Sequence, residues 1–204
     1  LYRSALSRHI LAKDPSHCIK GPKKSMPLPQ FLKESEMDRL LDADFWSNTY
    51  SDVRARTIII MFYETGMRLA ELVGLDDGAV DFANHQLKVT GKRNKQRIIP
   101  FGEELEKALS DFIILRDDVV TKMSDAIFLS DKGQRMTCAQ VRNEVRKNLS
   151  RVCTLKKRTP HVLRHTFATA MLNHDAGLES VKKLLGHESL STTEIYTHTT
   201  FEQL

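Results

Sequence analysis

The sequence predicts a mainly α-helical fold with a small three-stranded antiparallel sheet, an α+β class. Two observations favour it: helix caps and glycine stops bound most segments of the chain, and the apolar pattern switches to strand-like alternation only between residues 79 and 100. With 204 residues, of which 41% are apolar, the chain is long enough to bury one sizeable core.

The N-terminal residues predict a tether rather than a core element. Residues 1–13 resemble the end of a helix, and residues 14–33 hold proline and glycine at the density of an extended linker. Because this linker begins so close to Leu1, we expect a fragment of a longer polypeptide whose upstream domain is missing.

Caps and glycines delimit the next elements. Ser35 with Asp38 predicts a capped helix start, and Gly66 and Gly74 predict helix ends. The strands are separated by residues 83–85 and by a basic turn at 91–95. The expected elements are a helix starting near residue 35, a buried helix over 53–64, a short helix over 69–73, and strands over 80–82, 86–89 and 97–99.

Downstream of the strands the sequence predicts helices. Thr159 is a good N-cap before Pro160, since proline suits the first helical position. Ser191 and Glu194 have the spacing of a capping box. The expected helices cover residues 103–115, 139–152, 160–173, 178–185 and 192–196.

Basic residues are concentrated in two stretches. The net charge is +5, yet residues 142–158 hold seven basic side chains against one acid, and residues 88–97 hold five and no acid. Such segregation is typical of a DNA phosphate-backbone footprint, although two solvated charged faces would give the same pattern. The candidate DNA-binding residues are Lys88, Arg93, Lys95, Arg97, Arg142, Arg146, Lys147, Lys156, Lys157 and Arg158.

Cysteine usage and apolar run length point to a cytoplasmic protein without a membrane segment. Cys18, Cys138 and Cys153 are odd in number, far apart and form no CxxC pair, so the sequence suggests neither a disulfide framework nor a cysteine zinc site. The longest apolar runs are only a few residues, whereas a membrane span requires roughly 20.

Several residues could act together on a phosphodiester. Arg68 follows a helix stop, and His161 and Arg164 share one face of the helix that starts at Pro160. Gly186 ends a helix and presents His187, and a capped turn then carries Tyr196. An arginine in the position of Arg68 is usually a surface residue, and a tyrosine in the position of Tyr196 usually packs against the core. Only the combination of these residues therefore indicates a catalytic site.

The chemistry of this combination is specific. Two arginines stabilise charge on the non-bridging oxygens of an attacked phosphate, as Arg68 and Arg164 would. A tyrosine hydroxyl with a pKa near 10 needs a base such as His161, and the leaving 5′ oxygen needs a proton, which Lys92 can supply. No carboxylate cluster for magnesium is visible, so we expect no metal and no cofactor.

The motifs, taken in order, resemble the tyrosine site-specific recombinase family of the integrase and Xer type. They are Thr65-Gly66-Met67-Arg68-Leu69-Ala70-Glu71-Leu72, the Gly91-Lys92-Arg93-Asn94-Lys95 turn, His161-Val162-Leu163-Arg164-His165, Leu185-Gly186-His187 and Tyr196. The resemblance spans about residues 32–200. It implies the tyrosine recombinase catalytic fold, with catalytic residues Arg68, Lys92, His161, Arg164, His187 and Tyr196 and supporting residues Glu71 and His165.

The resemblance also implies a mechanism and an assembly. Tyr196 would form a 3′-phosphotyrosyl link to DNA, and four protomers would act on two synapsed double-stranded sites. Residues 1–13 would be the remnant of the last helix of a core-binding domain, residues 14–33 the linker, and residues 34–204 a catalytic domain lacking its C-terminal helix. We therefore expect the fragment alone to be a monomer that binds DNA weakly.

Three alternatives remain open at the level of sequence. A type IB topoisomerase-like enzyme would use the same chemistry to relax DNA, and a non-catalytic module of the same fold would bind DNA without cleaving it. A histidine–metal hydrolase built on His161, His165 and His187 is disfavoured, because Arg164 would repel a cation and no carboxylate ligand accompanies the histidines.

Overall fold

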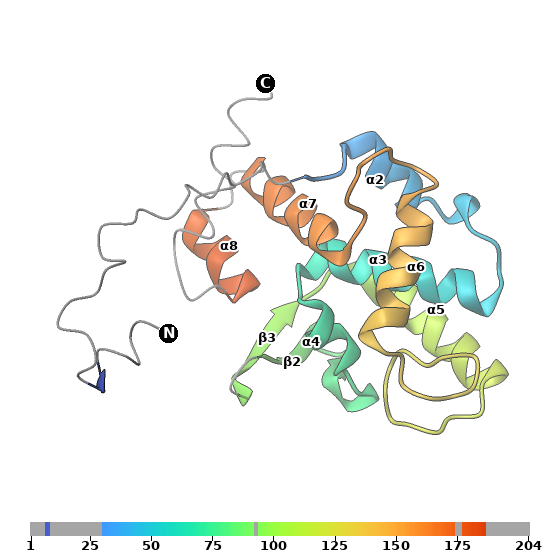
Figure 1. Ribbon diagram of the computed structural model, residues 1–204. Helices are drawn as coiled ribbons and strands as arrows, with labels where there is room; N and C mark the ends of the chain where they lie inside the picture. Colours follow the sequence, from blue (N-terminus) through green and yellow to red (C-terminus); the bar gives the residue numbers. More distant parts are fainter. Residues whose placement is uncertain (1–6, 9–29, 92–93, 174–176, 187–204) are drawn as a thin grey trace.

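The computed structural model describes residues 7–8, 30–91, 94–173 and 177–186 (Figure 1). These residues confirm the predicted class, because helices dominate and one three-stranded antiparallel sheet lies among them. In chain order the elements are α2 (Glu34–Leu41), η1 (Ala43–Phe45), α3 (Tyr50–Thr65), α4 (Leu69–Val73), η2 (Asp77–Ala79), β1 (Val80–Asp81), β2 (Gln86–Thr90), β3 (Gln96–Pro100), α5 (Glu103–Val119), α6 (Cys138–Leu149), α7 (Pro160–Asn173) and α8 (Leu178–Leu185).

Helix α3 is the centre of the fold. Its residues 58–62 (Ile58, Ile59, Ile60, Met61 and Phe62) are all fully buried, and a helix that is apolar on every side must be covered on every side. Helices α2, α5, α6 and α7 supply that cover. Figure 1 shows α3 behind α6, with α7 and α4 on the side that faces the sheet.

The sheet is a meander in the order β1-β2-β3, and β2 packs against α4. Leu87 and Val89 are buried while Lys88 between them is exposed, because successive strand residues point to opposite faces. On β3, Ile99 pairs with Leu87 and Arg97 pairs with Val89. Arg97 is therefore on the inner face of the sheet.

A left-handed glycine allows three helices to meet. Gly66 ends α3 with a φ of 57°, which only glycine adopts cheaply. A Cβ atom at this position would lie 2.4 Å from Phe167 Cδ1 and 2.8 Å from Leu185 Cδ2, so α7 and α8 leave no space for a side chain. Arg68 follows two residues later and is thus delivered to the junction of these helices.

Several boundaries differ from the predicted ones for identifiable reasons. α3 begins at Tyr50 rather than 53, because the Thr49 hydroxyl accepts a hydrogen bond from the Asp52 N–H. α2 begins at Glu34, before Ser35, because the Lys33 N–H donates to the Glu36 carboxylate at 2.9 Å. α5 extends beyond residue 115 to Val119, and Arg116 in its last turn is completely buried.

The other predicted helices either match the observed bounds closely or lie outside the described residues. The helices expected over 69–73, 160–173 and 178–185 have the bounds of α4, α7 and α8, and α6 ends at Leu149 rather than at 152. The helix expected over 192–196 and most of the predicted tether lie outside the described residues. Among the helices that are described, none is long and apolar enough to cross a membrane.

Candidate active site

A small cationic pocket lies between the start of α4, the first turns of α7 and helix α6. Its volume is about 100 Å³, and Arg68, Arg142, His161 and Arg164 all line it. The remaining lining residues are Met67, Leu69, Thr159 and Pro160. The structure thus brings together three of the six predicted catalytic residues, Arg68, His161 and Arg164, from segments nearly a hundred positions apart in the chain.

Arg68 is held at the N-terminus of α4 with part of its side chain facing solvent. Its Nη1 donates to Glu71 Oε1 at 3.0 Å, and its Nη2 donates to the Gly186 carbonyl at 2.7 Å. Its backbone N–H also donates to Glu71 Oε2, at 2.7 Å. The side chain is 33% exposed, so the guanidinium is fixed from behind while one side remains open to a ligand.

Glu71 is the buried anchor of this arrangement, with only 3% of its side chain exposed. Burial by itself raises the pKa of a carboxyl group. Hydrogen bonds from Arg97 and Arg68 outweigh that effect and hold the pKa of Glu71 below its ordinary value. Glu71 therefore stays ionised, and its carboxylate holds both the backbone N–H and the guanidinium of Arg68.

Arg164 is buried and comes from the first turns of α7. It donates through Nη1 to the Gly66 carbonyl and through Nη2 to the Leu185 carbonyl, the second at 2.7 Å. Arg164 therefore joins the C-terminus of α3 to the C-terminus of α8. Because an arginine has its N–H donors in a fixed planar fork, these contacts fix the orientation of the guanidinium at the edge of the pocket.

The two histidines of α7 are kept neutral. Burial lowers the pKa of His161, and the positive charges of Arg164, Arg142 and Arg68 lower it further. Burial lowers the pKa of His165 to about 4, with further contributions from His161 and Arg164. A neutral imidazole at His161 is able to accept a proton near neutral pH, which is what a general base requires.

The remaining predicted site residues fall into two groups. Lys92, Arg93, His187 and Tyr196 lie outside the described residues. The exposed members of the predicted DNA-binding set are Lys88, Lys95, Arg142, Arg146, Lys147, Lys156 and Lys157, and Arg158 is half-buried.

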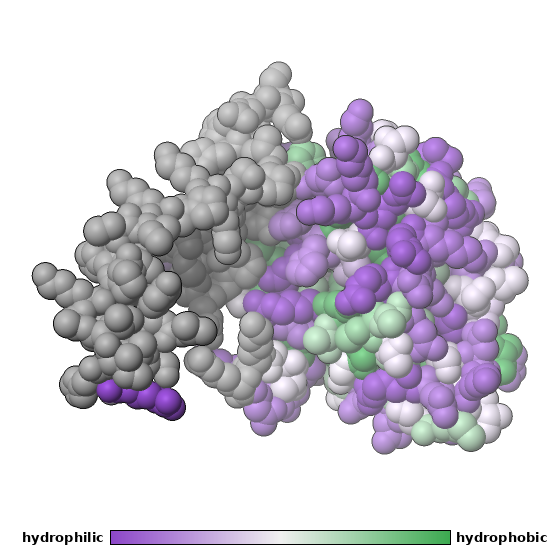
Figure 2. All heavy atoms as spheres, in the orientation of Figure 1, coloured by the Kyte–Doolittle hydropathy of each residue, from purple (hydrophilic) through white to green (hydrophobic). Residues whose placement is uncertain are grey.

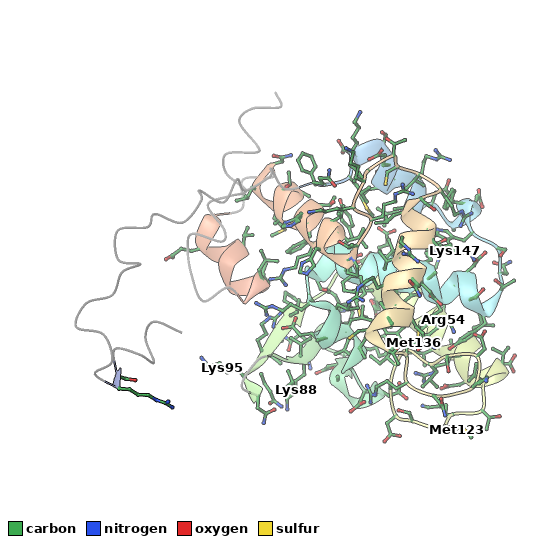
Figure 3. The ribbon with its side chains drawn as sticks, viewed as in Figure 1. Arg54, Lys88, Lys95, Met123, Met136 and Lys147 are labelled. Atoms are coloured by element: carbon green, nitrogen blue, oxygen red, sulfur yellow. The ribbon has the colours of Figure 1, made fainter. Side chains whose placement is uncertain are left out.

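These basic side chains come from the β2–β3 hairpin, from α6 and from the segment between α6 and α7. Figure 3 shows Lys88 and Lys95 at the far end of the β2–β3 ladder and Lys147 on α6, with α4 between the two elements. The same view in Figure 2 is predominantly hydrophilic over α6, with a patch of hydrophobic residues near α4. The second basic stretch contributes Arg142 to the wall of the pocket, next to Arg68 at the start of α4.

The structure places two basic residues, Arg142 and Arg97, differently from what the sequence predicted. Arg142 was expected only as a contact to the DNA backbone, and the structure places it in the pocket wall. Arg97 was assigned to the same footprint, but its guanidinium contacts Glu71 inside the protein. The alternation of β3 is the signal that indicates the second feature, since Arg97 is two residues from the buried Ile99.

Comparison with known proteins identifies the family. The model of the phage integrase family matches residues 30–203. Tyrosine recombinase XerC of Chlorobaculum tepidum is 35% identical over 224 residues, which cover 100% of this chain and 67% of the relative. Tyrosine recombinase XerC of Listeria monocytogenes is 34% identical over 206 residues, covering 100% of this chain and 69% of the relative.

Solved structures agree with this assignment. The crystal structure of XerA recombinase has a TM-score of 0.73 and 33% identity, covering 88% of this chain and 62% of that one. XerH site-specific recombinase bound to a palindromic difH substrate has a TM-score of 0.75 and 28% identity, covering 85% of this chain and 51% of that one. The family match, the relatives and the fold together show that the chain belongs to the phage integrase family, whose enzymes are the tyrosine recombinases of site-specific recombination.

Proposed function

We propose that this chain cleaves and rejoins double-stranded DNA by transesterification, with Tyr196 as the nucleophile. The observation that carries the proposal is the convergence of Arg68, Arg164 and the neutral His161 on one small pocket. Two fixed guanidinium groups stabilise the charge that develops on a phosphate under attack. The relative XerH, which is bound to its difH substrate, supports DNA as the partner.

The steps follow from the chemistry of the groups. The Tyr196 oxygen attacks the scissile phosphorus, and His161 accepts the phenolic proton while Arg68 and Arg164 hold the non-bridging oxygens. The bond from phosphorus to the 5′ oxygen breaks, and Lys92 donates the proton that this oxygen gains. His187 hydrogen-bonds the same phosphate. One phosphodiester is exchanged for one phosphotyrosyl ester, so the bond energy is conserved and the reverse reaction rejoins the strand.

The assembly extends this chemistry to two DNA sites. We propose that four protomers synapse two duplexes in the cytoplasm and exchange strands in two rounds. The predicted division into a helix remnant at 1–13, a linker at 14–33 and a catalytic domain at 34–204 belongs to the same proposal, since the linker would join the catalytic domain to a second DNA-contacting domain. This chemistry is compatible with the integration or excision of a DNA element, and equally with the resolution of chromosome dimers.

The test is to trap the covalent intermediate. The protein is incubated with a duplex that carries a nick just beyond the scissile phosphate, so that the cleaved end diffuses away and rejoining fails. We expect a covalent protein–DNA adduct with the wild type and with Tyr63→Phe, a control tyrosine of α3 outside the cationic pocket. We expect none with Tyr196→Phe.

Each possible result is informative. An adduct that persists in Tyr196→Phe would remove Tyr196 from the mechanism. Binding without any adduct, in wild type and control alike, would favour a non-catalytic module. Relaxation of a supercoiled plasmid without exchange between two sites would favour the topoisomerase-like reaction instead.

A further inference from the structure

An ion pair behind the pocket has no direct role in the proposed steps. Arg97 Nη1 donates to Glu71 Oε1 at 2.7 Å and Arg97 Nη2 donates to Glu71 Oε2 at 2.9 Å, which is a bidentate pair. Arg97 Nε donates to the Leu184 carbonyl at 3.2 Å. All three nitrogens of the guanidinium are thus engaged within the protein, and only 19% of the side chain is exposed.

The Glu71–Arg97 pair contacts the chain just before two other predicted catalytic residues. A Cβ atom on Gly91, the residue before Lys92, would lie 3.3 Å from Glu71 Oε1 and 3.8 Å from Arg97 Nη1. A Cβ atom on Gly186, the residue before His187, would lie 3.4 Å from Arg97 Cζ. Both backbone segments therefore rest on the pair at glycines, where they approach it closely.

Arg97 also completes a set of three guanidinium groups at the end of α8. The carbonyls of Leu184, Leu185 and Gly186 accept hydrogen bonds from Arg97, Arg164 and Arg68 respectively. The last carbonyls of a helix have no partner within the helix and carry partial negative charge. Three cations from three separate elements thus fix the point at which the chain leaves α8.

We propose that Arg97 is a positioning residue for catalysis and does not contact DNA. Through Glu71 it fixes Arg68, and through Gly91 and the end of α8 it sets the starting points of the segments that carry Lys92 and His187. Lysine cannot replace it, because a single ammonium lacks the planar fork that engages both carboxylate oxygens and a carbonyl at once. The inference rests on the proposed function and names a residue that this function does not require by itself.

The experiment separates binding from cleavage in Arg97→Lys and Arg97→Gln. We expect both variants to bind a duplex carrying the recombination site within about threefold of wild type. We also expect an unchanged slope of log affinity against log salt, since no phosphate contact is lost. The single-turnover cleavage rate at saturating protein should fall about 100-fold in both, because small misplacements of catalytic groups have effects of that size.

Arg135→Lys is the matched control. Arg135 also donates to backbone carbonyls, those of Val73 and Leu75, and to a carboxylate, that of Asp76, but it does not line the cationic pocket. Replacing it should leave both the affinity and the cleavage rate unchanged. A cleavage rate for Arg97→Lys equal to that of wild type would overturn the proposal. So would weaker binding in Arg97→Gln, with a salt slope smaller by about one and an unchanged saturated rate, because that pattern belongs to a phosphate contact.

A bridging-sulfur substrate tests the link to Lys92. When sulfur replaces the 5′ oxygen, the bond from phosphorus to sulfur breaks and a thiolate leaves. A thiol has a pKa of about 8.5, so its thiolate leaves without a proton, whereas an alkoxide needs one. The defect of Arg97→Lys should shrink at least about tenfold on this substrate. An equal defect on both substrates would overturn the link between Arg97 and Lys92.

A spectroscopic measurement tests whether Arg97 orients Arg68 without relying on DNA cleavage. In ¹⁵N-arginine-labelled protein, the Nε–H signal of Arg68 should move in Arg97→Lys and stay in place in Arg135→Lys. An Arg68 signal that does not respond to Arg97→Lys would sink the positioning role even if wild type cleaves DNA. Conversely, a wild type that forms no adduct would end the proposed function, while this signal would still show whether Arg97 orients Arg68.

Discussion

At the scale of single residues, the environment decides which charge state each group of the pocket holds. His161 is close to three arginines and partly removed from water, so its pKa lies below the ordinary histidine value. Glu71 is more deeply buried but hydrogen-bonded to two arginines, so its pKa is also lowered and it remains an anion. The pocket therefore pairs permanent cations with a neutral imidazole, which is the combination that phosphate attack by a phenol needs.

The pH dependence of cleavage tests the state of His161. Its imidazole must be neutral to accept a proton, so activity is present above its pKa and lost as pH falls through it. Because that pKa is lowered, the acid limb of the apparent second-order cleavage rate should lie below pH 6.5, the usual histidine value. His161→Ala should lower the rate by about 10²- to 10⁴-fold and abolish this limb.

His85→Ala is the control for this measurement. His85 is an exposed histidine that contacts Glu106 at 3.2 Å and does not line the pocket. Its removal should leave the profile as it is. An acid limb that remains unchanged in His161→Ala would assign the titrating group to another residue.

At the scale of elements, a buried arginine joins the central helix to the helix that carries Arg142. Arg54 on α3 donates through Nε at 3.1 Å to Glu144 on α6, and through Nη1 at 2.9 Å to the Leu129 carbonyl. It also contacts Asp131 and lies over the Tyr50 ring at 4.8 Å. Only 6% of its side chain is exposed. Figure 3 shows Arg54 beside α6, where this contact fixes the position of the pocket wall.

Removing one partner of this contact should destabilise the fold strongly. Arg54→Met leaves the Glu144 carboxylate buried without its cation, and such changes lower the free energy of unfolding by about 3 to 5 kcal/mol. Combining it with Glu144→Leu should recover part of that loss, because no uncompensated charge then remains buried. Chemical denaturation measures both. Arg39→Met, at an exposed position of α2, should stay within about 0.5 kcal/mol of wild type. A loss below 1 kcal/mol in Arg54→Met would contradict this account.

At the scale of the whole molecule, the two basic stretches lie on either side of α4, and one of them contributes Arg142 to the cationic pocket (Figure 3). Lys88 lies on β2 and Lys95 directly precedes β3, whereas Arg146 and Lys147 lie on α6. These four side chains are exposed. A DNA backbone that crosses from one stretch to the other would cross α4, whose first residue, Leu69, lines the pocket.

Salt dependence of DNA binding tests this path. Each phosphate contact that is removed should lower the slope of log affinity against log salt by about one. We therefore expect Lys147→Gln and Lys88→Gln each to weaken DNA binding and to lower this slope by about one. The double variant should lower the slope by about two. Lys107→Gln, at an exposed position of α5 outside both stretches, should leave the slope unchanged. Equal slopes in all of these variants would contradict the proposed path.

The amino-acid sequence by itself determined the local features of this protein. Gly66 ends α3, Thr159 and Pro160 begin α7, and alternation identified the strands, because caps, turns and side-chain periods depend on neighbours a few residues apart. The spacing of His161 and Arg164 also predicted that they share a face. The order of the motifs was sufficient to indicate the family.

Only the tertiary structure decided which distant groups meet. Arg164 contacts Gly66, 98 positions away, and Arg68 contacts Gly186, 118 positions away. The inward direction of Arg97 and the place of Arg142 in the pocket wall also depend on how the sheet and α6 pack against α4. Such contacts result from burial of the whole core, which no short stretch of sequence contains, and so a basic residue cannot be assigned to DNA or to the protein interior from its charge alone.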